Sequence, residues 1–276
     1  MSDELNQFIG LAFVENLIIE PQNSERDEIL AKGIDLVPNK LILRGFRDKD
    51  IEYREKWRLP LPSHHQGLTL VLELSNVPTQ ELRNEDTLIH RAITAFRMFK
   101  AGRVNIDGII VSHPNPEWAG SYITGSSVQW SPIYYLDISE IENFKQLFDK
   151  VKSIDYEKYP SFRIACSRFE NTYQSKTYEN RIIDFCISFE ALFLKGENPQ
   201  TYRGRGHLIG MSCGMLLGKD NQERNKIRTT IREMFTLRNK IVHGSPMTES
   251  LKEKIYEFGY DNVENYLRHS LVKLLP

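Results

Sequence analysis

The chain has 276 residues, of which 40% are hydrophobic and 26% charged, and its formal net charge at pH 7 is -1. This composition excludes a disordered or fibrous chain, and the length allows one large domain or two ordinary ones. The near-zero charge excludes a strongly basic surface that would attract nucleic acid over its whole area. No apolar run approaches the roughly 18 residues of a membrane span, and the acidic stretch MSDELNQF lacks the apolar core of a secretory signal. We therefore expect a cytoplasmic protein with no membrane partner.

Residues 1–155 have the mixed pattern of an α/β domain. Short runs of branched apolar residues between turn residues predict strands at LAFVENLIIE, KLILRG, LTLVLELS, IDGIIVSHP and SPIYYLDI. Helical periodicity predicts one helix over about residues 86–100 and another that begins at Asp137 or Ser139. The GSYITGSS stretch lacks the lysine and spacing of a phosphate-binding loop, so we expect a turn there.

Two adjacent histidines, His64 and His65, lie in the proline-containing loop LPLPSHHQG. A metal-binding or catalytic role would need a third ligand at a matching spacing, and the sequence offers none. We therefore interpret them as exposed loop histidines, and we expect no metal and no cofactor in this protein.

Residues 156–276 have the pattern of an all-α bundle with short connections. Strand patterns end near SIDYEKYPS, and helices are predicted over residues 163–173, 178–194, 204–217, 222–243, 249–258 and 263–275. Small residues recur in the third of these helices, at Gly206, Gly210, Ser212 and Gly214, and would let another backbone approach closely. The expected fold class is therefore α+β, with an N-terminal mixed α/β domain at 1–155 and a helical bundle at 156–276.

Three cysteines, Cys166, Cys186 and Cys213, lie in apolar helical segments of this bundle. Their number is odd and no CxxC pair occurs, which favours reduced thiols in a protein core.

The stretch DNQERNKIRTTIREMFTLRNKIVHG carries most of the functional information. Asp220 is expected to cap a long helix, Glu223 can reach back to the free amides, and Gly244 and Pro246 end it. One face of this helix is apolar, and it consists of Ile227, Ile231, Met234, Phe235, Ile241 and Val242. Arg238 lies in the middle of that face, and Asn239 and His243 lie on its flank.

A second charged residue, Glu190, lies among apolar residues of the helix at 178–194. Because an unpaired charge that faces a core is costly, we expect Glu190 to pair with Arg238 and to orient it. The alternative is an ion pair that only fixes the register of two helices.

His243 can donate or accept a proton near neutral pH, although a capping histidine at a helix end is also common. Arginine, amide and imidazole together suit metal-free phosphodiester cleavage, in which the histidine moves the proton and the arginine neutralises the phosphate oxygens. Between Arg203 and His243 the chain carries nine lysines or arginines against three acidic residues. Such an excess suits a polyanion, or else only a solvated helix face. The residues that we expect to bind RNA are Arg203, Arg205, Arg228, Arg232 and Lys240.

The segment RNKIVHG resembles the R-x4-6-H signature of HEPN domains, the higher eukaryote and prokaryote nucleotide-binding superfamily. Residues 168–194 are similar to the helix pair of the Apea-like branch, with Glu190 at its acidic position. Arg205 in YRGRGHLIG resembles an arginine that precedes the next helix of that branch. The resemblance is strongest over residues 160–275 and extends loosely over 85–155, where HRAITAFRMFKAGRV is similar to what precedes this type of HEPN domain.

The resemblance implies a metal-independent endoribonuclease of the defence or toxin type, homodimeric through its HEPN domain. It assigns Arg238 to transition-state charge, Asn239 to positioning, His243 to acid–base chemistry and Glu190 to orientation. The substrate would be single-stranded or tRNA-like RNA, and residues 1–155 would sense a trigger or restrain the nuclease. Two alternatives remain: a non-catalytic HEPN module that binds RNA, nucleotide or a protein partner, and a purely structural interaction protein.

Overall fold

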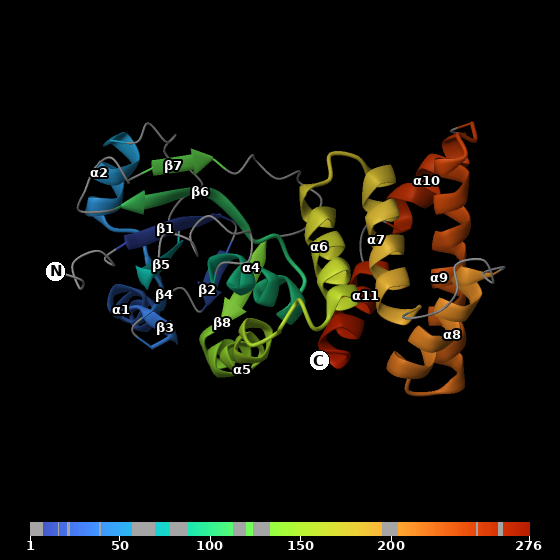
Figure 1. Ribbon diagram of the computed structural model, residues 1–276, viewed down its shortest axis with the longest axis horizontal. Coiled ribbons are helices and arrows are strands. Elements are labelled where there is room, and N and C mark those ends of the chain that lie inside the picture. Colours follow the sequence, from blue (N-terminus) through green and yellow to red (C-terminus); the bar gives the residue numbers. More distant parts are fainter. Residues whose placement is uncertain are drawn as a thin grey trace. The chain divides into compact units, whose positions relative to one another are not determined.

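The computed structural model describes residues 8–15, 17–20, 23–38, 40–56, 70–77, 88–112, 120–123, 133–194, 204–246, 248–258 and 262–276. The chain forms two compact units, and the change from the first to the second falls between Lys152 and Ser153. All the described strands belong to the first unit, and the described part of the second is helical (Figure 1). The expected mixed α+β class with a helical C-terminal part is thereby confirmed. His64, His65 and Arg203 lie outside the described residues.

An antiparallel six-stranded sheet forms the centre of the first unit, in the order β3-β4-β5-β1-β6-β7 (Figure 1). Its strands are β1 (Phe8–Glu15), β3 (Ile34–Val37), β4 (Leu41–Gly45), β5 (Leu70–Val77), β6 (Asn105–Ser112) and β7 (Gly120–Ile123). In the register of this sheet Leu11 of β1 lies opposite Glu73 of β5 and Ile110 of β6. A separate parallel pair joins β2 (Leu17–Glu20) to β8 (Tyr134–Asp137).

The turn predicted for GSYITGSS is wrong for its first four residues. Gly120–Ile123 forms β7 and pairs with β6, so that Gly108 lies opposite Ile123 and Ile110 opposite Ser121. The segment has no apolar alternation of its own, and it forms a strand because β6 supplies its hydrogen-bond partners. The rest of GSYITGSS lies outside the described residues.

The first unit also holds the helices α1 (Ser24–Lys32), α2 (Asp48–Lys56), α4 (Leu88–Phe99) and α5 (Ile141–Lys152), the last preceded by the short 3-10 turn η3 (Ile138–Glu140). The predicted start at Asp137 is confirmed, since its carboxylate accepts from the amide of Ser139, and Glu140 accepts from the amide of Asp137. Phe96 of α4 and Phe144 of α5 stack with ring centroids 4.0 Å apart. Sequence periodicity found α4 and α5 but neither α1 nor α2.

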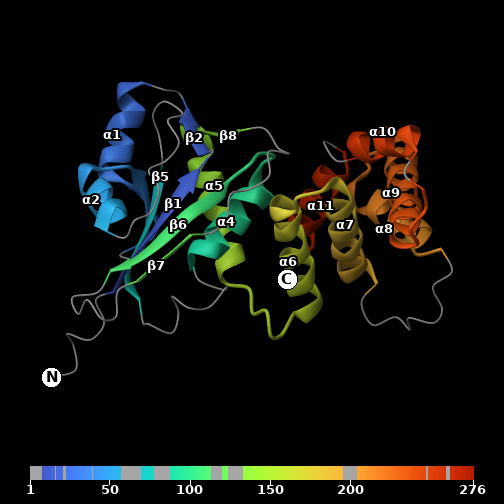
Figure 2. The same cartoon turned by 90° about the horizontal axis from the view of Figure 1, so that it is seen from above.

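The second unit consists of α6 (Pro160–Gln174), α7 (Tyr178–Phe193), α8 (Arg205–Leu217), α9 (Asn221–Val242), α10 (Glu249–Phe258) and α11 (Asn262–Lys273). Each helix begins and ends within three residues of its prediction. α6 lies beside α7, and α8 lies beside α9 (Figures 1 and 2). The three cysteines are buried, free thiols, as their apolar setting predicted. Among the described residues, no helix combines the length and the apolar character needed to cross a bilayer.

Glycines at four-residue spacing let α8 lie unusually close to α9. A Cβ atom added at Gly210 would lie 2.8 Å from the carbonyl oxygen of Arg228, and one added at Gly214 would lie 2.8 Å from that of Arg224. One added at Gly206 would lie 2.6 Å from Cβ of Phe235. The predicted close approach is thus confirmed, and it occurs within the chain. These glycines therefore fix the distance between the two helices that carry the candidate site.

A buried polar network joins α6, α7 and α11. The carboxylate of Glu264 accepts hydrogen bonds from Arg181, Arg268 and the hydroxyl of Tyr173. Burial raises the pKa of Tyr173, and the nearby Glu264 raises it further, so the phenol stays protonated and donates. Because Glu264 compensates two buried guanidinium groups, it anchors α11 to the rest of the bundle.

Candidate functional site

The long helix α9 begins and ends as its sequence predicts. The carboxylate of Asp220 accepts from the amide of Glu223, and the Glu223 side chain accepts from the amide of Lys219. At the other end His243 is the C-cap, and Gly244 follows with φ of 66°. This positive φ favours glycine, since a side chain would be strained there.

The apolar face of α9 is shorter than its sequence pattern indicates. Ile227, Ile231, Met234 and Phe235 are buried as expected, and Leu237 is buried as well. Val242, however, is 50% exposed. Ile241 is half-buried, and the exposed side chains of Val242 and His243 show that the last turn of α9 extends beyond the core.

Arg238 lies half-buried at the edge of this core. Its Nη1 donates to Oδ1 of Asn239 over 3.1 Å. Its Nε is buried and has no hydrogen-bond partner among the described residues. Arg238 therefore keeps donor capacity for a group that is not part of the described chain.

The predicted pair between Glu190 and Arg238 is wrong. Oε1 of Glu190 instead lies 3.5 Å from Nη1 of Arg205, the first residue of α8. The start of α8 thus supplies a second arginine, Arg205, which pairs with the carboxylate of Glu190 in place of Arg238. Which of the two arginines forms the pair depends on how α7, α8 and α9 pack in the folded protein. Glu190 still lies on the same cavity as Arg238, with Arg205 as its partner.

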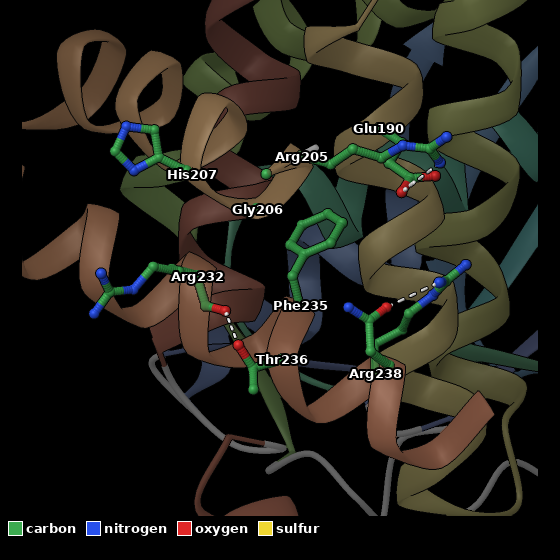
Figure 3. Close-up of a pocket in the computed structure, with 10 residues that line it drawn as sticks. Glu190, Arg205, Gly206, His207, Arg232, Phe235, Thr236 and Arg238 are labelled. Carbon is green, nitrogen blue, oxygen red and sulfur yellow. Dashed lines mark hydrogen bonds and ion pairs between the residues drawn. The ribbon is translucent and has the colours of Figure 1, made fainter. Parts of the chain in front are cut away.

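A cavity of about 490 Å³ lies between α8, α9 and the end of α7 (Figure 3). Its lining consists of Glu190, Gly204, Arg205, Gly206, His207, Arg232, Phe235, Thr236, Arg238 and Asn239. Three arginines outnumber one carboxylate among these described side chains, which together carry a net positive charge. Planar guanidinium groups match phosphate and carboxylate oxygens, which makes an anionic ligand the favoured occupant.

The N-terminus of α8 adds to the positive character of this cavity. Gly204 precedes the helix with φ of 92°, and no side chain caps the helix there. The first amides of a helix carry partial positive charge and attract anions. Backbone and side chains of this segment therefore favour the same kind of ligand.

Cys186 of α7 lies beneath this region of the molecule. Burial raises the pKa of its thiol well above the ordinary value, while the charge of Arg238 lowers it and that of Glu190 raises it. Both charges are therefore close to the thiol. Since the thiol is fully buried and neutral, we interpret Cys186 as part of the apolar support under the cavity rather than as a nucleophile.

The structure brings together some of the predicted site residues and separates others. Five of them line the cavity: Glu190, Arg205, Arg232, Arg238 and Asn239. Three do not, namely Arg228, Lys240 and His243. Lys240 and His243 are exposed on the last turn of α9, and Arg228 lies further towards its N-terminus. The predicted residues that the structure describes therefore divide into a group that lines one cavity and a group that lies on α9 outside it.

Sequence reasoning missed one histidine of this site. His207 lines the cavity, and its Nδ1 lies 3.3 Å from Nη2 of Arg228. It stands two residues after Arg205 in YRGRGHLIG, so its place in an arginine-rich segment was the available signal. The position of His207 around its own helix did not reveal this role, because the cavity forms only when α8 packs on α9.

The cavity suits an anion better than a metal ion. Among the described residues, no group of three or more His, Cys, Asp or Glu side chains is arranged to hold a metal. Glu190 is the single carboxylate among the described residues of the cavity lining and is already paired with Arg205. The arrangement can therefore bind and polarise a phosphate through arginine and amide donors.

Comparison with protein-family models, curated proteins and solved structures gave no match for this chain. The similarity to HEPN domains accordingly stays a prediction from the sequence, and the residues of the cavity are the basis on which function is inferred.

Proposed function

We propose that this protein is a metal-independent endoribonuclease that binds an RNA phosphodiester in the cavity between α8 and α9. The observation that carries the proposal is the concentration of Arg205, Arg232 and Arg238 in one cavity, where the single carboxylate among the described lining residues is already paired. RNA offers a phosphate at every nucleotide, and arginine binds phosphate through paired donors.

Within this proposal, Arg238 stabilises charge on the phosphate. It forms no ion pair with a described carboxylate, and its buried Nε has donor capacity to spare. A guanidinium that is not neutralised can gain most when negative charge builds up on the non-bridging oxygens. Asn239 holds one nitrogen of Arg238 and thereby orients it. Glu190 orients Arg205.

The proposed reaction begins with attack of the 2′-oxygen on the adjacent phosphorus. The 2′-hydroxyl loses its proton, the bond from phosphorus to the 5′-oxygen breaks, and that oxygen takes up a proton. The products are a 2′,3′-cyclic phosphate and a free 5′-hydroxyl, and no oxidant or metal enters the balance. We assign one of the two proton transfers to His243, which follows Asn239 by four residues and is exposed to solvent.

A second function, RNA binding without cleavage, is favoured by one observation. His243 does not line the cavity, whereas every arginine needed to hold a phosphate does. In this alternative the cavity binds the RNA strand, and His243 serves only as the C-cap residue of α9.

The first test is cleavage of a mixed RNA pool in EDTA by the wild type and by His243→Ala. We expect the wild type to cut and to leave cyclic phosphate ends, and we expect His243→Ala to lose about 10²–10⁴-fold in rate, the usual contribution of a general acid or base. RNA affinity and the unfolding midpoint should stay near wild-type values, because the side chain is exposed.

A matched control is His269→Ala, which removes an exposed histidine from α11 of the same bundle. It should cleave like the wild type. If His243→Ala also cleaves like the wild type, the role assigned to His243 is wrong. RNA binding without any cleavage by the wild type would favour the binding-only alternative.

We further propose that the protein forms a homodimer through the second unit. On α8, Leu208, Met211 and Met215 lie on one face and are exposed, Met215 by 72%. Such a row of exposed apolar side chains is characteristic of a contact surface. The glycine face of α8, by contrast, is occupied by α9 and is not available to a partner.

Met215→Glu is expected to weaken this dimer at least tenfold, because it would bury a charge in the contact. Sedimentation equilibrium over a range of concentrations would measure it, with Thr229→Glu, which adds the same charge at an exposed position of α9, as the comparison. A wild type that stays monomeric at high concentration would refute the dimer.

A further inference from the structure

The cationic residues of the cavity form two groups that lie on either side of Phe235. Figure 3 shows Glu190, Arg205 and Arg238 on one side, and His207 and Arg232 on the other. The guanidinium groups of Arg232 and Arg238 point in opposite directions (Figure 3). One compact anion therefore does not reach both groups.

The spacing along α9 supports this separation. Arg232 and Arg238 are six residues apart, which corresponds to an axial rise of about 9 Å in an α-helix. At about 100° per residue their side chains also leave the helix about 120° apart. Phe235 lies between them, is 6% exposed, and packs against Gly206, so it keeps the two ends apart.

The end of the cavity at His207 has hydrogen-bond donors that can bind an anion. Nη2 of Arg228 lies 3.3 Å from Nδ1 of His207, and a guanidinium nitrogen can only donate. Nδ1 must then be the acceptor, and the ring proton of the neutral imidazole lies on Nε2. His207 can therefore donate from Nε2, on the side of Phe235 that also carries Arg232 (Figure 3), while Arg228 fixes its tautomer. Guanidinium and imidazole donors of this kind suit a phosphate group.

We propose that the cavity binds two consecutive phosphates of one RNA strand. The scissile phosphate occupies the end at Arg205 and Arg238, and the neighbouring phosphate occupies the end at His207 and Arg232. Arg232, His207 and Arg228 are then positioning residues, which set where the strand lies. This inference rests on the proposed nuclease function, and it specifies the substrate as a strand with at least two adjacent phosphates.

The test compares three RNA dinucleotides of mixed sequence, one with only its internal phosphate and two with an additional phosphate at the 5′ or the 3′ end. In EDTA, we expect one of the two end phosphates to raise kcat/KM of the wild type about 10–100-fold, through KM, as hydrogen bonds to a charged group would. For Arg232→Ala and His207→Ala, we expect kcat/KM for the dinucleotide with that end phosphate to be nearly the same as kcat/KM for the dinucleotide without it. His207→Gln, which keeps a side-chain donor, should retain part of the gain.

Binding of the matching 2′-deoxy dinucleotides separates the two proposals, because they lack the attacking hydroxyl. The same end phosphate should strengthen their binding to the wild type and not to Arg232→Ala. Lys226→Ala, an exposed cation on the same helix outside the cavity, should keep the wild-type ratio. If this pattern appears without cleavage of the RNA forms, the two-phosphate site stands and the nuclease proposal fails. Equal affinity of the wild type for all three dinucleotides would overturn the two-phosphate site.

Discussion

Replacing Arg238 with alanine is expected to lower the rate of RNA cleavage in EDTA about 10²–10³-fold, the usual effect of losing one donor to a transition-state oxyanion. The folded protein should lose little stability, by contrast. Glu190 is paired with Arg205, so the substitution leaves no stranded carboxylate. It also removes a buried Nε that has no partner among the described residues. Single-turnover cleavage and chemical unfolding of the same preparation measure both effects.

Lys226→Ala is the matched control, because it removes one positive charge from the same helix at an exposed position outside the cavity. It should weaken cleavage only slightly and equally for all RNA sequences. A loss of about 3–5 kcal/mol in the free energy of unfolding of Arg238→Ala would instead indicate a buried ion pair with a purely structural role. Unchanged cleavage by Arg238→Ala would refute its catalytic assignment.

The largest effect on stability is expected from Glu264→Gln. This substitution keeps the shape of the side chain but removes the charge that compensates Arg181 and Arg268, which are 1% and 2% exposed. Leaving buried charges without a counter-charge costs about 3–5 kcal/mol in the free energy of unfolding. Hydrogen exchange of the amides of α6, α7 and α11 measures this loss within the second unit, and the amides of β1, β5 and β6 provide an internal reference.

Glu233→Gln removes an exposed carboxylate from α9 and is the matched control for Glu264→Gln. It should change stability by less than about 0.5 kcal/mol. If the amides of α6, α7 and α11 are equally protected from hydrogen exchange in the two variants, Glu264 is not the anchor of α11 that its hydrogen bonds indicate.

Helices of the second unit were predictable because their signals are local. Asp220 caps α9, Thr177 caps α7, and Gly244 adopts the positive φ that ends α9. Apolar periodicity then supplied the buried faces, from Ile227 to Phe235 in α9. β3 and β7 escaped prediction because they are the two outer strands of the six-stranded sheet, where pairing with one neighbouring strand, rather than their own composition, holds them in place.

The candidate site was predictable only in part. Glu190 and Arg238 were identified because a charge on an apolar helical face is conspicuous in any sequence. Their partners were not identified, because the contacts of Glu190 with Arg205 and of Arg238 with Asn239 are known only from the folded structure. His207 became a site residue only because Gly206, Gly210 and Gly214 let α8 approach α9 closely.

The sequence by itself determined the helices of the second unit, the caps of α9, the burial of most apolar positions there and the identity of the charged residues that face the core. Tertiary structure alone decided which side chains meet between helices: Glu190 with Arg205, His207 with Arg228, and Glu264 with Arg181. The physical reason is that capping and periodicity act within about one turn of a helix, whereas an ion pair between helices depends on how closely and in which direction they pack.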